Sequence, residues 1–217
     1  MTKTENIAVV CASGGMDSAV CAALACRDSG RVYFLHADYG QLTETAERER
    51  FGRLAAHFGA AGKLLIRLDH LREIGGSSLT DRAIDVPEAD LANPSIPSTY
   101  VPFRNAQIMS AAVAWAEVLG AGAVYIGAVE QDSSGYPDCR RSFFEAFERA
   151  VDLGTRPGTR IDIRIPLIGM KKSEIVRLGL SLGVPFELTW SCYRSEGTAC
   201  GRCGRTWPGP PRCRWPG

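Results

Sequence analysis

The sequence predicts an α/β fold in which a parallel sheet carries helices on both faces, followed by a C-terminal zinc-binding segment. Three observations lead to this prediction. Short apolar runs alternate with longer amphipathic stretches, a glycine follows each of those stretches, and four cysteines gather after residue 190. Repeated strand–helix–glycine units indicate parallel strands joined by crossover helices.

The predicted strands are short runs rich in Val, Ile, Leu and aromatic residues, which suit a buried pleated sheet. They comprise residues 7–11, 31–37, 63–68, 123–127 and 161–165. Ligands of such sheets bind at the carboxyl ends of the strands. The loops that follow these runs are therefore the expected place of a functional site.

The predicted helices repeat apolar residues at helical spacing. They comprise residues 17–29, 43–58, 103–119, 140–153 and 171–182, with Gly30, Gly59, Gly120, Gly154 and Gly183 as left-handed stops. In the second helix a solvated charged face is expected from Glu44, Glu47, Arg48, Glu49 and Arg50. Residues 69–100 are rich in Gly, Ser, Asp and Pro, which predicts a long loop that is either functional or disordered.

The bulk composition is that of a globular protein. The chain has 217 residues, 45% of them hydrophobic, and a net charge of +1. One sizeable core is expected, and the small net charge favours neither a nucleic-acid nor a membrane partner. A polar N-terminus without a long apolar segment predicts a cytoplasmic protein. In that reducing compartment Cys11, Cys21 and Cys26 are expected to be small buried hydrophobes.

The hexapeptide SGGMDS at residues 13–18 follows the first predicted strand and opens the first helix. Two glycines allow a tight turn close to a ligand. The helix start aims free N–H groups and the positive end of its dipole at the same point, and Ser13 and Ser18 add hydroxyl donors. The segment is an anion cradle suited to phosphate or pyrophosphate. The alternative is a plain strand-to-helix turn; the full hexamer in this context favours the nucleotide.

Three further loops bring polar groups to the same edge of the sheet. Residues 36–41 (HADYGQ) supply an imidazole, the carboxylate of Asp38 and an amide, although a polar turn explains them equally well. Arg104 lies near a helix N-terminus, where the dipole disfavours a cation, so it indicates an anionic partner such as a nucleotide phosphate, or a nearby carboxylate. In residues 130–140, Tyr136 can stack on a heterocycle, Asp138 can accept from ring N–H groups, and Arg140 can grip a carboxylate.

The cysteines near the C-terminus follow a C-x7-C-x2-C pattern at Cys192, Cys200 and Cys203. Thiolates two residues apart on a turn can bind one zinc ion, and a structural site needs four ligands. Incidental thiols are the alternative for the isolated CxxC.

Together, SGGMDS, HADYGQ, TYVPFRN, SGYPDCR, the segment from Pro166 to Lys171, TWSCY and CGRC resemble the 7-cyano-7-deazaguanine synthase family of the queuosine pathway, in the same order and over about residues 5–205. The resemblance implies an ATP pyrophosphatase domain of the adenine nucleotide α-hydrolase-like fold over residues 1–189 and a zinc-binding segment over residues 190–217. It implies ATP, Mg²⁺ and Zn²⁺ as cofactors, and 7-carboxy-7-deazaguanine and ammonia as substrates. The product, 7-cyano-7-deazaguanine (preQ0), forms through an acyl adenylate and an amide. A homodimer is also expected.

The resemblance also implies the site residues. Nucleotide contacts are expected along Ala12, Ser13, Gly14, Gly15, Met16, Asp17, Ser18, Ala19, Val20, Cys21 and Ala22. The expected catalytic residues are Asp17, Ser18, Asp38 and Arg104, and the expected substrate contacts are Tyr136, Asp138 and Arg140. The expected zinc ligands are Cys192, Cys200, Cys203 and Cys213.

The C-terminus departs from the family pattern CG-x-C-x-x-C, which would place the last cysteine at position 206, where this chain has Thr206. The prolines of the following WPGPPRCRWPG forbid a helix, and Cys213 is the remaining thiol. Other functions therefore stay open. One is an ATP pyrophosphatase that forms an amide or modifies tRNA; another is a catalytically impaired nucleotide-binding relative, such as a zinc-ribbon regulator. A turnover assay with ATP and the deazapurine acid distinguishes them.

Overall fold

The computed structural model of the protein describes residues 6–87, 95–130 and 135–195, together with Cys200 and Cys203. At its centre is a five-stranded sheet in the order β3-β2-β1-β4-β5. The strands are β1 (Ile7–Cys11), β2 (Arg31–Asp38), β3 (Gly62–Arg67), β4 (Ala123–Ile126) and β5 (Asp162–Arg164). All four pairings are parallel, which confirms the predicted sheet.

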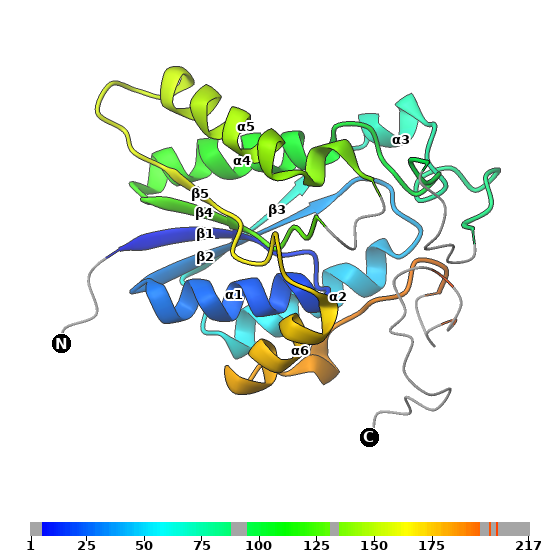
Figure 1. Ribbon diagram of the computed structural model, residues 1–217, viewed down its shortest axis with the longest axis horizontal. Helices are drawn as coiled ribbons and strands as arrows, with labels where there is room; N and C mark the ends of the chain where they lie inside the picture. Colours follow the sequence, from blue (N-terminus) through cyan, green and yellow to red (C-terminus); the bar gives the residue numbers. More distant parts are fainter. Residues whose placement is uncertain (1–5, 88–94, 131–134, 196–199, 201–202, 204–217) are drawn as a thin grey trace.

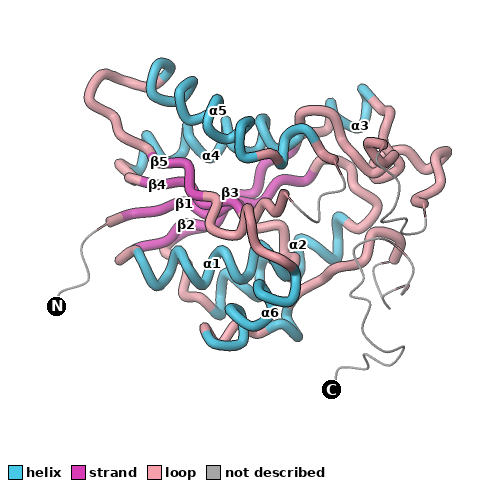
Figure 2. Tube along the Cα trace, viewed as in Figure 1, coloured by secondary structure: helices cyan, strands magenta, loops and turns pink. Residues whose placement is uncertain are grey.

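Helices cover both faces of this sheet, as predicted (Figure 1). One face carries α1 (Met16–Asp28), α2 (Glu44–His57) and α6 (Lys172–Ser181), and the other carries α4 (Arg104–Leu119) and α5 (Arg141–Gly154). Figure 2 shows the strands enclosed between these two layers. Among the described residues, none of the helices is long and apolar enough to cross a membrane.

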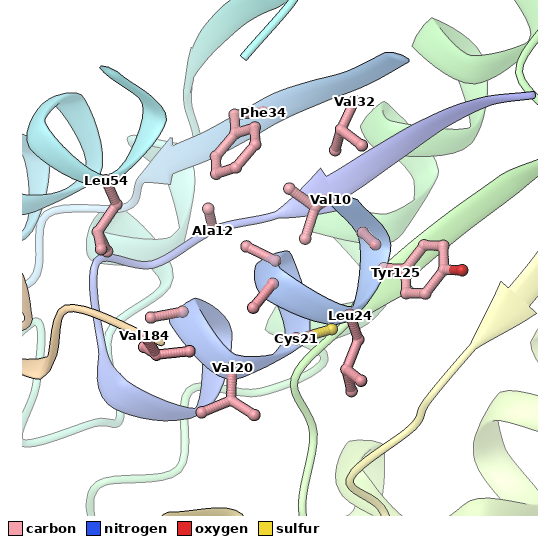
Figure 3. Close-up of a cluster of buried hydrophobic side chains, with 14 of the residues drawn as sticks. Val10, Ala12, Val20, Cys21, Leu24, Val32, Phe34, Leu54, Tyr125 and Val184 are labelled. Carbon is pink, nitrogen blue, oxygen red and sulfur yellow. The ribbon is translucent and has the colours of Figure 1, made fainter. Parts of the chain in front are cut away.

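The core has two halves because successive strand residues point to opposite faces of the sheet. On one side Val10 and Phe34 pack against α1, close to Leu54 of α2 (Figure 3). On the other side Val9 and Leu35 belong to a cluster with α4 and α5.

Two of the three early cysteines are core residues, as predicted. Cys11 and Cys21 are buried, whereas Cys26 is partly exposed. Burial raises the pKa of Cys11 to about 12 and that of Cys21 well above its ordinary value. Both thiols therefore stay protonated near neutral pH and behave as small apolar groups.

Two of the five predicted glycine stops are wrong. Gly59, Gly120 and Gly183 have positive φ angles, but Gly30 and Gly154 do not. The C-cap residues of α1 and α5 are instead Ser29 and Thr155, which adopt extended conformations. An extended residue leads the chain directly away from the helix, so neither exit needs a left-handed residue.

The predicted loop over residues 69–100 contains structure that the sequence pattern did not indicate. A short helix, α3 (His70–Ile74), opens it. Buried Leu71, Leu79 and Val101 then pack with Tyr39 into a small separate cluster. This part of the chain therefore packs beside the carboxyl ends of β2 and β3. Two further single turns, η1 (Pro137–Cys139) and η2 (Phe186–Leu188), lie in later loops.

Candidate active site

The SGGMDS segment forms a tight turn between β1 and α1. Gly14 has a φ of 80°, and a Cβ at this position would lie 2.6 Å from the carbonyl oxygen of Glu47 in α2. Only glycine fits there, because the turn is both left-handed and pressed against another helix. Gly15 is the N-cap of α1, with φ −86° and ψ 166°. The turn is thus held in place by its contact with α2.

The two serines of this loop interact with each other and with its backbone. Ser18 Oγ donates to the Gly15 carbonyl oxygen at 2.8 Å, and Ser13 Oγ lies 3.3 Å from Ser18 Oγ. The Gly15 N–H also donates to Ser13 Oγ, at 3.3 Å. These bonds shape a preformed turn at the positive end of α1, where free N–H groups attract an anion.

Part of the expected nucleotide-contact segment faces away from this turn. Ala19, Val20, Cys21 and Ala22 are at most 1% exposed and belong to the core cluster under α1. Their side chains hold the helix on the sheet, so the first turn of α1 and the preceding loop are the parts that offer groups to a ligand.

Lys172 is a functional candidate that the sequence reasoning missed. It is the first residue of α6, and its Nζ lies 2.8 Å from both carboxylate oxygens of Asp17. This places a cation at the edge of the anion cradle. The available signal was the Pro166-to-Lys171 segment of the family resemblance, which stopped one residue short of Lys172.

His36 and Asp38 lie inside β2 and not in the loop after it, which corrects the expected strand end at Ala37. His36 Nδ1 donates to the carbonyl oxygen of Ala12 at 2.8 Å, and its Nε2 lies 3.2 Å from Asp38 Oδ1. Arg48 Nε donates to the other oxygen, Asp38 Oδ2, at 2.9 Å. Burial raises the pKa of Asp38, but His36 and Arg48 outweigh it and hold the pKa below its ordinary value. Asp38 thus joins β2 to α2 through its Oδ2, while its Oδ1 faces His36 Nε2 without hydrogen-bond geometry among the described residues.

The expectation that Glu47 belongs to a solvated face is wrong. Glu47 is only 5% exposed, and its carboxylate accepts hydrogen bonds from Thr43 Oγ1 at 2.8 Å and from Gln41 Nε2 at 3.3 Å. Gln41 Oε1 in turn accepts from the Tyr39 N–H at 2.8 Å. Glu47 thus orders the loop after β2, while its own backbone carbonyl packs on Gly14.

Arg104 lies close to Tyr39, Tyr136 and Asp138, and these four residues are together termed the Arg104 cluster. Arg104 follows Phe103, which has a φ of 57°, and its NH1 donates to Tyr39 Oη at 3.0 Å. Its guanidinium also lies 5.1 Å from the centroid of the Tyr39 ring. Burial lowers the pKa of Arg104, but Tyr39, Tyr193, Tyr136 and Asp138 outweigh it and raise the pKa above its ordinary value. Among the described residues no carboxylate forms an ion pair with Arg104, so the cation is available to an anionic ligand.

The loop before α5 is fixed to the start of α4. Asp138 Oδ2 accepts the Asn105 N–H at 2.9 Å, and Asn105 Nδ2 donates to the Asp138 carbonyl oxygen at 3.1 Å. Among the described residues, Asp138 Oδ1 is buried without a hydrogen-bond partner. Burial raises the pKa of Asp138, and the Asn105 N–H and the Arg104 charge offset only part of that rise. A buried free acceptor of this kind fits a ligand N–H donor.

The two other expected substrate contacts differ from each other in their surroundings. Tyr136 is 9% exposed; its Oη lies 2.5 Å from Thr99 Oγ1, and its ring centroid lies 5.6 Å from that of Tyr100. Arg140, by contrast, is exposed at the start of α5. The structure therefore gathers Arg104, Tyr136 and Asp138, and leaves Arg140 at the surface of the same loop.

Cys192, Cys200 and Cys203 converge, with their sulfur atoms all within 4.8 Å of one another. Backbone N–H groups face these sulfurs: those of Cys200 and Arg194 point at Cys192 Sγ, at 3.3 and 3.4 Å. The N–H of Tyr193 points at Cys203 Sγ and that of Cys203 at Cys200 Sγ, both at 3.4 Å. Sulfurs surrounded by N–H donors fit a thiolate metal site. Cys213 and Thr206 lie outside the described residues.

Comparisons with known proteins point to one family. Residues 7–206 match the family described as queuosine biosynthesis protein QueC. The chain is 54% identical over 196 residues to the 7-cyano-7-deazaguanine synthase of Chlorobaculum tepidum, and the match covers 90% of this chain and 86% of that relative. It is 53% identical over 207 residues to the enzyme of the same name from Acidobacterium capsulatum, covering 94% of this chain and 90% of that one.

A solved structure confirms the fold class. The crystal structure of a 4-thiouridine synthetase–RNA complex with bound ATP superposes with a TM-score of 0.54 and 20% sequence identity. The superposition covers 91% of this chain and 47% of that chain. At this identity the likeness concerns the arrangement of strands and helices alone.

Proposed function

The chain belongs to the QueC family of queuosine biosynthesis proteins, and we propose from this membership that it converts 7-carboxy-7-deazaguanine and ammonia to 7-cyano-7-deazaguanine with ATP. The structural observation that carries the proposal is the preformed anion cradle of residues 13–18, with Lys172 at its edge. The cradle and the Arg104 cluster lie at the carboxyl ends of neighbouring strands, where a nucleotide and a second substrate can meet.

The proposed reaction activates the two oxygens of the substrate carboxylate one after the other. The substrate carboxylate attacks the α-phosphorus of ATP, pyrophosphate leaves, and an acyl adenylate forms. Ammonia then attacks the carbonyl carbon, AMP leaves with the activated oxygen, and the product is an amide. The amide oxygen attacks a second ATP, pyrophosphate leaves again, and loss of AMP and two protons from nitrogen gives the nitrile. AMP is a good leaving group where oxide is not, so the protein mainly supplies position and charge stabilisation.

The proposed roles follow from the contacts at each site. The first turn of α1, Ser18 and Lys172 hold the phosphates, and Asp17 is the carboxylate that would hold Mg²⁺ beside them. Arg104 faces the negative charge of the substrate carboxylate and the adenylate. The free Oδ1 of Asp138 accepts a ring N–H of the deazaguanine, and Tyr136 lines its face. Asp38 acts indirectly, through His36 and the Ala12 carbonyl.

The metal, partner and location proposals rest on other features. Cys192, Cys200 and Cys203 would hold structural Zn²⁺, with Cys213 as a candidate fourth ligand. The thiols of Cys11 and Cys21, which form no disulfide, suit a reducing cytoplasm. A homodimer is proposed because β3 is an edge strand, on which Leu65 is 43% exposed. Analytical ultracentrifugation tests that assembly: a single sedimenting species of monomer mass contradicts it.

The decisive experiment mixes the purified protein with ATP, Mg²⁺, ammonium and 7-carboxy-7-deazaguanine. We expect AMP, pyrophosphate and the nitrile, with no AMP when the acid is omitted. An amide-forming relative would stop at the amide. A tRNA-modifying relative would release AMP only with tRNA, and a nucleotide-binding regulator would release none.

A further inference from the structure

The segment that leads into the cysteine cluster also touches the phosphate loop. The N–H of Trp190 donates to the Gly14 carbonyl oxygen at 2.9 Å. The carbonyl oxygen of Trp190 lies 3.4 Å from the position of a Cβ on Gly15. Both backbone polar groups of Trp190 are therefore beside the two glycines of the turn. Since Gly14 is already pressed against α2 on its other side, residue 190 closes the second side of the loop.

The same segment reaches the other half of the site three residues later. Tyr193 packs with the cluster that contains Tyr39 and Leu71, and also with the cluster that contains Cys192 and Cys203. Tyr39, in the first of these clusters, is the residue whose hydroxyl oxygen accepts from Arg104 NH1 at 3.0 Å. Residues 190–193 therefore run from the phosphate loop to the Arg104 cluster, and Cys192 lies between the two contacts.

Among the described residues, this segment packs on the cysteine cluster and on the cluster around Tyr39. Residues 190–195 belong to neither helix nor strand, and in the described part of the chain the apolar cluster around Cys192 is small: Val86 and Cys203 are its other buried members, with Leu42, Trp190, Tyr193 and Cys200 partly buried against it. In a segment with so small a core, metal binding supplies much of the free energy of folding. Without the metal, the hydrogen bond of Trp190 to Gly14 and the packing of Tyr193 against the Tyr39 cluster would have to be formed by a loosely ordered chain.

We propose that residues 190–193 couple the cysteine cluster to the active site, so that zinc and ATP bind cooperatively. Zinc binding at the three thiolates orders Trp190 and Tyr193, and these complete the phosphate loop and the Arg104 cluster. The effect is reciprocal, because two ligands that favour the same ordered state raise each other's affinity by the same factor. This inference rests on the proposed function, since it takes the loop of residues 13–18 as the ATP site.

The coupling is measured on the full-length protein by calorimetry with α,β-methylene ATP and Mg²⁺, before and after zinc is removed with a chelator. We expect zinc removal to weaken nucleotide binding by about tenfold, within the usual range of coupling between sites. The nucleotide should slow the transfer of zinc to a chromophoric chelator by a similar factor.

Two variants at one position isolate the hydrogen bond to Gly14. Trp190→Pro removes the N–H donor, whereas Trp190→Ala removes the same side chain and keeps the donor. Thr189 has φ −92° and ψ 162°, which is the conformation that a residue before proline prefers. We expect both variants to retain zinc equally, with zinc-dependent nucleotide binding in Trp190→Ala and zinc-independent, weak binding in Trp190→Pro.

The possible contrary results separate the coupling from the proposed function. Equal nucleotide affinity of the unmodified protein with and without zinc overturns the coupling and leaves the ATP site intact. Zinc-dependent binding in Trp190→Pro overturns the route through Trp190. Failure of both the zinc-loaded and the zinc-free protein to bind the nucleotide overturns the ATP site itself.

Discussion

Ser18 and Asp17 illustrate how single side chains act in the phosphate loop. Ser18 Oγ is bonded to the Gly15 carbonyl oxygen and lies beside Ser13 Oγ, whereas Asp17 is paired with Lys172. We expect Ser18→Ala to slow pyrophosphate release about tenfold or more, as the loss of one stabilising donor does. Asp17→Ala should be at least as severe, because it also frees Lys172. Ser181→Ala, an exposed serine of α6, is the control, and near-normal release in both loop variants would exclude this loop as the site.

Asp138 offers a sharper test, because among the described residues only its Oδ2 has a hydrogen-bond partner. Asp138→Asn keeps an oxygen for the Asn105 N–H but replaces the free acceptor Oδ1 with an NH₂ donor. We expect the affinity for the deazaguanine to fall by about 1–3 kcal/mol, the usual penalty for an unsatisfied buried group. ATP affinity should change little when both ligands are titrated by calorimetry. Loss of ATP binding with the heterocycle still bound would reverse the assignment.

The same residue predicts a pH effect on substrate binding. Burial raises the pKa of Asp138, so on acidification the carboxylate takes up its proton at a higher pH than an ordinary Asp. A protonated Oδ1 no longer accepts freely, and heterocycle affinity should therefore decline at a pH above the ordinary value of 3.8. The pH dependence of folding stability has the opposite sign. A folded-state pKa above 3.8 contributes stability that is fully present below pH 3.8, and this contribution is lost as the pH rises through the raised folded-state pKa. Asp138→Asn should abolish the acidic decline in affinity.

Among the elements, β4 and α1 meet at Gly127, just after β4. A Cβ on Gly127 would lie 2.8 Å from the Asp17 carbonyl oxygen and 3.0 Å from the Ser18 nitrogen. These are backbone atoms, so Gly127→Ala must push the start of α1 away from the sheet. We expect a loss of about 1–3 kcal/mol in stability, typical of overpacking, and weaker ATP binding.

Gly122, just before β4, is the matched control for Gly127. A Cβ there meets nothing within 4 Å, and neither glycine has a positive φ. Gly122→Ala should therefore leave both the stability of the protein and its ATP affinity unchanged. An identical Tm and ATP affinity in the two variants would contradict the close approach at Gly127.

The proposed zinc site yields a prediction from the departure at Thr206. Three cysteines would supply thiolates, and a threonine hydroxyl is a poor zinc ligand, so either Cys213 or water would complete the site. Purified protein should therefore contain less than one zinc per chain and lose it readily to chelators. Thr206→Cys should tighten zinc retention, whereas Cys213→Ser should weaken it only if Cys213 is a ligand. Tight one-to-one zinc in Cys213→Ser that resists chelation would exclude both arrangements.

At the scale of the whole molecule, the sequence predicted the sheet and its helices because the alternation of apolar runs and amphipathic stretches is local. Glu47 shows where that reasoning fails: its position on α2 is a solvent-facing one by helical spacing, but the loop after β2 folds over it. Lys172 shows that local patterns also fail to predict contacts within the site. It lies 155 residues from Asp17 in the sequence, and only tertiary packing brings the two together. The motifs identified the loops, but the partners of their side chains depended on the packing of α2, α6 and residues 190–193.

The proposed reaction also predicts the product stoichiometry of the whole protein. If one active site performs both activations, the protein should release two AMP and two pyrophosphate for each nitrile formed, and the amide should appear before the nitrile. The amide supplied in place of the acid should yield the nitrile with one AMP and without added ammonium, because its nitrogen is already in place. These ratios are read by chromatography of AMP, amide and nitrile over a time course. One AMP per nitrile from the acid, or failure of the amide to react, would show that the second oxygen activation does not use ATP in the proposed way.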